Sequence, residues 1–310
     1  MNDRVTGRFA PTPSGRLPLG NLLCCLLASL SVRSQDGRFL LRIEDLDVPR
    51  CPQRLSLQAI EDLSWFGFRW DEEPLYQSQR SSIYQNHLDA LQKQGLIYPC
   101  FCTRAQLMAS VAPNLGDTQV VYQRTCANLT PGEAERLSLT RRPATRLRVP
   151  DEVVSFTDGL YGVQSENLAK DCGDFILRRS DGLFGYQLAV VVDDALSGVN
   201  AVVRGRDILT ATPRQIYLLK KLGYPVPEYI HIPLLMDADG RRLAKRDRDL
   251  DLTALSRRFT AEELLGKLAF SAGILEEERP ASLEELTRLF DWQNVKREDM
   301  RLPRSLTAAI

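Results

Sequence analysis

The first hundred residues carry a regular alternation of strand-like and helix-like apolar patterns. Residues 5–10 and 39–43 are short apolar runs of the kind found in buried strands. A longer apolar stretch covers 19–34, and apolar residues recur at helical spacing over 55–66 and 81–94. A glycine follows each of the last two segments, as at many helix ends. The order strand, helix, strand, helix predicts a parallel sheet with helical crossovers.

The middle of the chain, residues 98–180, has another pattern, with cysteines, turn residues and short strand-like runs. We expect an inserted α+β module there. Apolar β-branched runs at 188–192 and 199–203 then predict a return to strands of the sheet, and 229–236 predicts one more strand.

Helix start signals are clear in the last third of the chain. Thr212 and Pro213 are expected as the N-cap and first residue of a helix that runs to Leu222. Thr260 and Ser282 are each followed three residues later by glutamate and then by an apolar run, which is the pattern of a capping box. These two boxes predict a helical C-terminal region.

Composition is that of an ordinary globular protein, with 310 residues, 44% hydrophobic and 26% charged. This length favours two domains. Because 40 basic and 40 acidic residues cancel, a bulk attraction to nucleic acid or to an anionic membrane is excluded. The most apolar stretch, 22–32, is too short to span a membrane. The seven cysteines are an odd number, so we expect reduced thiols in a cytoplasmic protein. We also expect no membrane contact and no obligate protein partner.

The loop before the first long helix is a candidate phosphate site. A helix N-terminus offers free N–H groups and a positive dipole end, and Gly20 would let a ligand approach the backbone closely. Asn21 adds a polar side chain at the same point. The alternative is a proline-rich connection into a core helix.

A second candidate is the acidic segment that follows the strand 39–43. Glu44 follows Arg42 on the same strand face and could accept hydrogen bonds from an ammonium group. The alternative is a solvated acidic loop. The two histidines, His87 and His231, lie in amphipathic or apolar surroundings, and we interpret both as packing residues.

Several motifs in consistent order resemble the class I glutamyl-tRNA synthetases. In chain order they are RFAPTPSG from Arg8, LGN from Leu19, FLLRIEDLD from Phe39, FGYQLAVVVDD from Phe184, VRGRD from Val203 and RLAKR from Arg242. The second motif stands where this family has its HIGH sequence, and the last stands where it has the KMSKS loop. The resemblance covers about residues 1–250.

The resemblance implies an α/β fold: the Rossmann-type parallel sheet of a class I aminoacyl-tRNA synthetase catalytic core. Its two halves would be residues 1–97 and 181–255, the second with the KMSKS-like loop. Residues 98–180 would form an inserted zinc-containing α+β module, and 256–310 a short helical C-terminal region.

The short paralogues of this family, the glutamyl-Q tRNA(Asp) synthetases, are the closer match, because too few residues follow the Lys245 loop for an anticodon-reading domain. The resemblance implies activation of glutamate by ATP, which the family uses with Mg²⁺. It also implies transfer of the glutamate to queuosine in the anticodon stem-loop of tRNA(Asp). Two alternatives stay open. One is a catalytically weakened nucleotide- or RNA-binding paralogue, and the other is a truncated synthetase that charges tRNA(Glu).

Cys100, Cys102 and Cys126 are the candidate metal ligands. Spacing alone favours free thiols, since a C-x-C pair is not the usual C-x-x-C arrangement. The resemblance implies a structural Zn²⁺ site and supplies Tyr122 as the fourth ligand.

The remaining site residues are those that the resemblance implies. The glutamate site would contain Arg8, Phe9, Ala10, Pro11, Thr12, Glu44, Tyr186 and Arg204. The ATP site would contain Thr12, Gly20, Asn21 and Lys245. The residues assigned to the chemical step are Gly20, Asn21 and Lys245.

Three departures from the family motifs bear on activity. Pro18 replaces the first histidine of the HIGH motif and removes a donor to the developing phosphate charge, a loss that typically costs ~10²–10³ in rate. In the KMSKS-like loop Arg242 keeps a positive charge, whereas Ala244 lacks the serine hydroxyl.

Overall fold

A mostly parallel sheet lies at the centre of the molecule, in a computed structural model that describes residues 4–103, 106, 121–241 and 252–307. The strand order is β3-β2-β1-β9-β10-β6-β7. The strands are β1 Thr6–Phe9, β2 Arg38–Ile43, β3 Leu75–Tyr76, β6 Val153–Asp158, β7 Gly162–Asn167, β9 Ala201–Gly205 and β10 Glu228–Ile232. All neighbours pair in parallel except β6 and β7, which form an antiparallel hairpin. The predicted Rossmann-type sheet is therefore confirmed.

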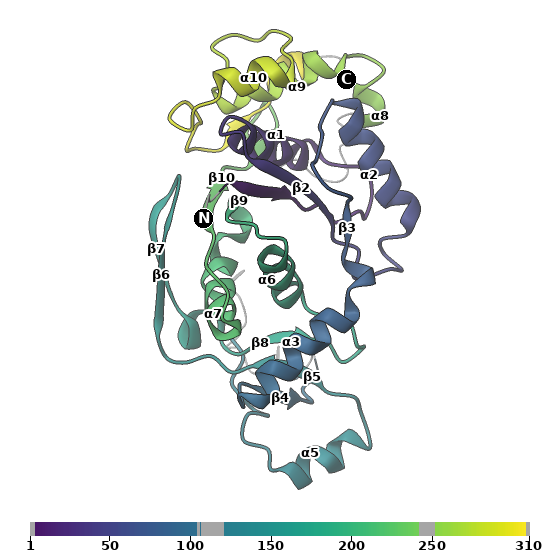
Figure 1. Ribbon diagram of the computed structural model, residues 1–310, viewed down its shortest axis with the longest axis vertical. Helices are drawn as coiled ribbons and strands as arrows, with labels where there is room; N and C mark the ends of the chain where they lie inside the picture. The colour runs from purple at the N-terminus through teal and green to yellow at the C-terminus, as the bar shows by residue number, and fades with distance from the viewer. Residues whose placement is uncertain (1–3, 104–105, 107–120, 242–251, 308–310) are drawn as a thin grey trace.

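Helices cover both faces of this sheet (Figure 1). On one face lie α1 (Leu19–Arg33) and, packed against it, α9 (Ala261–Ala272) and α10 (Leu283–Leu289). Because α1 lies between the sheet and the C-terminal helices, it is buried on nearly all sides, which explains its apolar composition. α2 (Gln53–Trp65) adds its apolar stripe to the same core.

The opposite face carries α6 (Tyr186–Leu196) and α7 (Thr212–Leu222), with α3 (Ser81–Lys93) packed on both. The prediction of a strand at 188–192 was wrong, since these residues form the middle of α6. A short, wholly apolar run does not distinguish a buried strand from a buried helix, and every residue from 188 to 194 is buried here. The predicted strand at 199–203 is present as β9.

Two other predicted boundaries differ in the structure. The single strand expected over 229–236 is interrupted at Pro233, which cannot donate to a strand ladder. Its second part, β11 (Leu235–Met236), pairs instead with β12 (Met300–Arg301). Thr212 is the first helical residue of α7 and not its N-cap, which is Ala211, because the short helix η3 (Arg206–Ala211) runs directly into α7.

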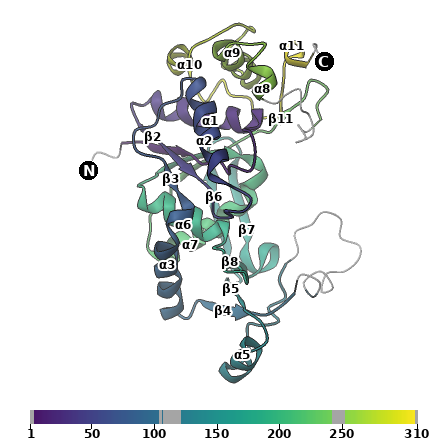
Figure 2. The same cartoon turned by 90° about the vertical axis from the view of Figure 1, so that its right-hand side faces the viewer.

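A second, antiparallel sheet lies at the far end of the molecule in both views (Figures 1 and 2). It consists of β4 (Ile97–Cys100), β5 (Ala144–Leu147) and β8 (Phe175–Arg178), with α5 (Pro131–Ser138) beyond it. The hairpin β6–β7 belongs to the edge of the main sheet, although it falls inside the interval 98–180 that we expected to form one module.

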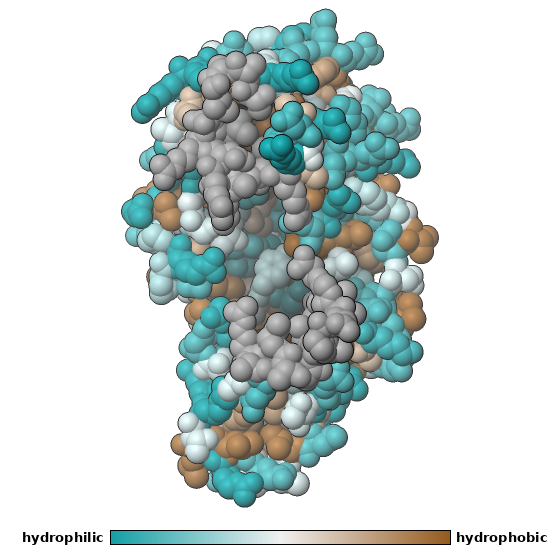
Figure 3. All heavy atoms as spheres, turned by 180° about the vertical axis from the view of Figure 1, so that it is seen from behind, coloured by the Kyte–Doolittle hydropathy of each residue, from teal (hydrophilic) through white to brown (hydrophobic). Residues whose placement is uncertain are grey.

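The remaining elements are short. They are η1 Gln77–Gln79, η2 Leu168–Cys172, η3 Arg206–Ala211, α8 Leu252–Leu255 and α11 Arg304–Thr307. The capping box at Thr260 is confirmed, and the Ser282 hydroxyl accepts from the Glu285 N–H. Seen from behind, the molecule exposes apolar side chains near its lower end, which carries α5 (Figure 3). Among the residues described, no helix has the length and apolarity needed to cross a bilayer.

Candidate active site

A row of charged and polar side chains crosses one face of the main sheet. It contains one residue from each of five neighbouring strands, Arg42, Arg8, Arg204, His231 and Asp158, on β2, β1, β9, β10 and β6. Strand register and the alternation of side chains place all five on the face covered by α6 and α7. Each is at most 5% exposed. Buried charges are costly unless they are paired or bound to a ligand, so their partners define the site.

Two of the arginines share one carboxylate from α6. Arg8 Nε donates to Asp194 Oδ1 over 3.0 Å, and Arg42 Nη1 donates to the same oxygen. Burial opposes ionisation of Asp194, but Arg42 and Arg8 outweigh it and lower its pKa. Arg42 also donates to Glu44 Oε1 over 3.1 Å. Asp194 therefore neutralises part of the charge of the pair and holds both guanidinium groups in place.

Arg204 has a different set of partners. Its Nε donates to His231 Nε2 over 2.9 Å, and its terminal nitrogens donate to Gln215 Oε1 and Thr212 Oγ1, each over 2.7 Å. None of these acceptors is charged, and within the described ranges no carboxylate lies within ion-pair distance of Arg204. A guanidinium group has five N–H donors, so two remain after these three bonds. Among the residues that the structure describes, Arg204 is thus a buried cation with no direct anionic partner.

Glu44 lies where β2 ends, beside a cavity of about 220 Å³ that is also lined by Thr12, Gln77 and Tyr186. Burial raises the pKa of Glu44, against the opposing effect of Arg42 and Arg8. Tyr186 is the first residue of α6 and is 39% exposed. Burial raises the pKa of its hydroxyl, against the opposing effect of the Arg204 charge. The charged side chains that line this cavity are Glu44, Asp47, Arg50 and Arg179.

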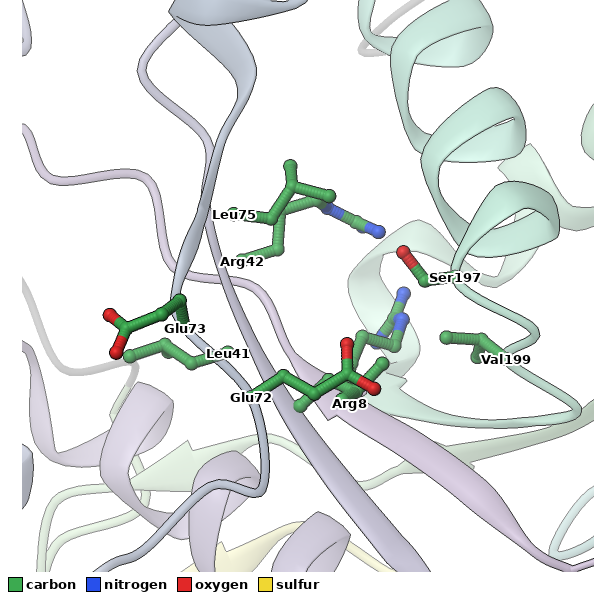
Figure 4. A pocket seen from close by; sticks show the side chains of 9 residues that line it. Arg8, Leu41, Arg42, Glu72, Glu73, Leu75, Ser197 and Val199 are labelled. Carbon is green, nitrogen blue, oxygen red and sulfur yellow. The ribbon is translucent and has the colours of Figure 1, made fainter.

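A smaller cavity of about 100 Å³ reaches Arg8 and Arg42 from another side, near Glu72, Leu75 and Ser197 (Figure 4). It is large enough for a few water molecules, each of which occupies about 30 Å³ in the liquid. We assign no substrate to it.

The N-terminus of α1 faces open space. Pro18 is its N-cap and contributes no side-chain capping bond. A Cβ added at Gly20 would meet no heavy atom within 4 Å, and Asn21 is half-buried beside it. Thr12, in the preceding loop, is exposed and lines the larger cavity. This arrangement leaves room for an anion at the helix terminus.

The other expected site residues differ in their surroundings. The Phe9 side chain packs in the core between α1 and the sheet, so any contact it makes in the site would involve its backbone. Pro11 is buried, Ala10 is half-buried, and the Pro11 carbonyl accepts from the Glu44 N–H over 2.9 Å. Lys245 and the rest of the KMSKS-like motif, with Arg242 and Ala244, lie outside the described residues.

Sequence reasoning missed five residues of this network: Asp158, Asp194, Thr212, Gln215 and His231. His231 is fully buried among aromatic rings, as expected of a packing residue, but its two ring nitrogens are also hydrogen-bonded to Arg204 and Asp158, so it belongs to the polar network as well. One signal for Asp194 was present. An acidic residue that closes an otherwise apolar run is expected to be buried with a partner.

Three thiols and a phenol converge in the second sheet's neighbourhood. Cys100, Cys102 and Cys126 have all their sulfur atoms within 4.8 Å of one another. Tyr122 Oη lies 3.4 Å from the Cys100 sulfur and 3.7 Å from the Cys102 sulfur. The Arg146 guanidinium lies over the Tyr122 ring, 3.7 Å from its centroid. The four side chains could hold one metal ion, and the structure brings together all four residues expected at such a site.

Comparisons of the sequence and of the structure with known proteins point to the same group of enzymes. Residues 4–296 match the family described as "tRNA synthetases class I (E and Q), catalytic domain". A "Glutamyl-Q tRNA(Asp) synthetase" of Symbiobacterium thermophilum is 46% identical over 99% of this chain and 98% of its own length. A protein with the same name from Nitratidesulfovibrio vulgaris is 46% identical over 87% of each chain. A glutamate tRNA ligase structure from Elizabethkingia meningosepticum superimposes with a TM-score of 0.85, at 24% identity, over 98% of this chain and 68% of that one.

Proposed function

Because the chain belongs to the class I synthetases for glutamate and glutamine, we propose that it activates glutamate with ATP and transfers it to the queuosine of tRNA(Asp). The family places it among ligases. The specific acceptor is supported by the relatives named glutamyl-Q tRNA(Asp) synthetase, which match nearly the whole chain at 46% identity.

The observation that carries the proposal is the buried Arg204 guanidinium, which has no carboxylate within ion-pair distance in the described part of the chain. A dicarboxylic amino acid would supply the missing anion, and a guanidinium group is suited to bind a carboxylate with two parallel hydrogen bonds. Arg8, which donates to Asp194, would add positive charge nearby. Glu44 would accept from the α-ammonium group, and Tyr186 would contact the amino acid from the start of α6. The backbone of residues 9–12 would also belong to this glutamate site.

The reaction has two steps. The α-carboxylate oxygen of glutamate attacks the α-phosphorus of ATP, which forms glutamyl-adenylate and releases pyrophosphate. A hydroxyl of the queuosine cyclopentenediol then attacks the activated carbonyl, forms an ester, and releases AMP. The protein would act by positioning these groups and by stabilising negative charge on the phosphates. The ATP would be contacted by Thr12, Gly20 and Asn21, and the positive end of the α1 dipole would favour its Mg²⁺-bound phosphates. Lys245 would neutralise negative charge on the triphosphate.

Pro18 should limit the rate of this enzyme. It occupies the N-cap of α1, where the family has a histidine donor, and proline has no donor. We expect Pro18→His to raise kcat of the activation step, by up to ~10²-fold, with little change in the KM for glutamate. Steady-state pyrophosphate exchange measures both parameters. Pro18→Ala is the matched control because it removes the ring without adding a donor, and an equal gain in both variants would contradict the argument.

The cysteine cluster supports a structural Zn²⁺ site with Cys100, Cys102, Cys126 and Tyr122 as ligands. In a tetrahedral zinc–thiolate site with Zn–S bonds of ~2.3 Å, two sulfur atoms are about 3.8 Å apart. The Cys102 and Cys126 sulfurs are 3.6 Å apart, so the observed spacing fits. When bound, the ion would cross-link a segment with a small core and would take no part in the reaction.

The direct test is glutamate-dependent exchange of pyrophosphate into ATP, without tRNA, with aspartate and glutamine in parallel. We expect exchange with glutamate alone. The absence of exchange at high enzyme and millimolar glutamate would favour a paralogue that binds nucleotide or RNA without activating an amino acid.

The acceptor is tested separately. We expect labelled glutamate to be transferred to queuosine-containing tRNA(Asp) and not to the same tRNA without queuosine. Transfer to the 3′ end of tRNA(Glu) would instead identify a synthetase of ordinary acceptor specificity.

A further inference from the structure

Behind Arg204 lies a chain of hydrogen bonds that the reaction scheme does not use. His231 Nε2 accepts from Arg204 Nε over 2.9 Å, and His231 Nδ1 lies 2.6 Å from Asp158 Oδ2. His231 is completely buried, and Asp158 is 2% exposed. The three side chains come from adjacent strands β9, β10 and β6, in that order across the sheet.

The partners of the imidazole determine its protonation. Arg204 Nε–H always donates, so His231 Nε2 must be an acceptor and the ring proton must lie on Nδ1, where it donates to Asp158. A protonated ring would direct an N–H at the N–H of Arg204 and bring two cations together. Burial lowers the pKa of His231, and Arg204 adds to this effect, against the hydrogen bond to Asp158. The neutral Nδ1–H tautomer is thus the form that fits the site.

The remaining contacts fix the ring and the carboxylate. The Tyr229 ring stacks on the imidazole at an interplanar angle of 16°, and the Phe156 ring approaches it edge-on. Asp158 Oδ1 accepts from the backbone N–H groups of Leu160 and Tyr161, each over 3.0 Å. Asp158 Oδ2 also accepts from the His231 N–H. The turn between β6 and β7 therefore holds the carboxylate, which in turn orients the imidazole.

We infer that Asp158 and His231 are positioning residues for glutamate recognition: they hold the Arg204 guanidinium in the orientation in which its two unused N–H groups face the substrate carboxylate. This inference rests on the proposed function for the identity of the ligand. Thr212 and Gln215 engage the terminal nitrogens of Arg204, whereas His231 alone engages Nε. Loss of the acceptor at Nε would therefore free the guanidinium to rotate and would leave a buried donor unpaired.

Thr212 Oγ1 also lies 3.1 Å from His231 Nε2. The test compares variants that separate the contacts of Nε2 from the contact of Nδ1 with Asp158. His231→Asn retains a donor near Asp158 but lacks an acceptor that reaches Arg204. His231→Gln places an amide oxygen close to the Nε2 position. Asp158→Asn favours the opposite tautomer, because the amide N–H would face Nδ1 and shift the ring proton to Nε2. His87→Asn is the matched control, since His87 also makes two hydrogen bonds, to Ile83 and Tyr224, away from the site.

Pyrophosphate exchange gives the expected result. Loss of one partner from a buried hydrogen bond to a charged group should raise the KM for glutamate about 10- to 100-fold in His231→Asn and Asp158→Asn. The KM for ATP should change less than about 2-fold, His231→Gln should retain more of the wild-type affinity, and His87→Asn should retain all of it. A purely structural role would change both KM values or would affect Asn and Gln variants equally.

A second measurement needs only the wild-type protein. The chain has two histidines, so ¹⁵N shifts of the imidazoles can be assigned with His87→Asn alone. We expect a neutral His231 with the proton on Nδ1 at pH 6 to 8. A protonated ring, or a proton on Nε2, would overturn the inference even if the variants did not fold. If the wild-type enzyme catalyses exchange and the folded His231→Asn variant has the same KM for glutamate, the positioning role is refuted but the proposed function is not. If the wild-type enzyme catalyses no exchange, the proposed function itself is refuted.

Discussion

At the scale of single residues, buried carboxylates hold the arginines of the site. Asp194 serves two of them, Arg8 and Arg42, and Asp158 reaches Arg204 through an imidazole. A buried guanidinium that has lost its partner cannot recover its hydration, so each carboxylate should matter for stability as well as for binding.

Asp194→Asn should destabilise the protein by about 3–5 kcal/mol, because it leaves two buried cations without their shared anion. Urea unfolding at neutral pH measures the change. Asp181→Asn is the matched control: Asp181 pairs with Arg179 at the surface, where both side chains are about half exposed. Its effect should stay below about 1 kcal/mol. Similar losses in the two variants would contradict the account.

His231 and Asp158 also make stability depend on pH. The folded-state pKa of His231 is lowered from its ordinary 6.5, so the unfolded chain binds its proton more readily. This contribution is complete above pH 6.5 and is lost as the pH falls below it. The pKa of Asp158 is lowered from 3.8, since hydrogen bonds from His231 and the backbone outweigh burial, so its contribution is lost only at lower pH.

Between pH 7.5 and 5.5 the free energy of unfolding should therefore fall in the wild-type protein and fall less in His231→Gln, which cannot be protonated. Chemical unfolding at the two pH values measures both slopes. An equal slope in the two proteins would show that His231 is not the group responsible.

At the scale of elements, α9 approaches the following segment unusually closely. A Cβ added to Gly266 would lie 1.8 Å from the carbonyl oxygen of Arg279, a backbone atom that cannot move without displacing its segment. Gly266→Ala should destabilise the protein by about 1–3 kcal/mol or more. Gly132→Ala in α5 is the control, because a Cβ there meets nothing within 4 Å and should be neutral or slightly stabilising. Thermal unfolding of both variants tests the packing.

At the scale of the whole molecule, the proposed metal centre and the proposed active site lie in different sheets and should be separable. The buried part of the cluster around Tyr98, Cys100, Phe101, Tyr122 and Cys126 is small. Cys126→Ser should abolish stoichiometric zinc, measured by elemental analysis, and should increase proteolysis near residues 98–147. Pyrophosphate exchange should change only a few-fold, because the ion would support structure and not the chemistry.

Cys172→Ala is the control for the metal experiment, because Cys172 is buried in another core cluster. It should retain zinc. Retention of zinc by Cys126→Ser, or its loss from Cys172→Ala, would place the metal elsewhere.

Much of this fold was predictable because its signals are local. Apolar periodicity located α1, α2 and α3, and the glycines at 67 and 95, which adopt φ values of +85° and +68°, follow the last two. The apolar run at 188–192 led to a wrong prediction of a strand. Its composition indicates burial only, and a helix enclosed on all sides has the same composition as a buried strand.

The sequence by itself determined most of the helices, the strands at 5–10, 39–43 and 199–203, and the family motifs, whereas the convergence of the three cysteines and Tyr122 became visible only in the structure. Tertiary structure alone decided which charges meet. Arg8 and Asp194 are 186 residues apart, and Asp158 and His231 are 73 apart. No local pattern encodes such pairs, since they arise only when neighbouring strands and the helices that cover them remove these groups from water together.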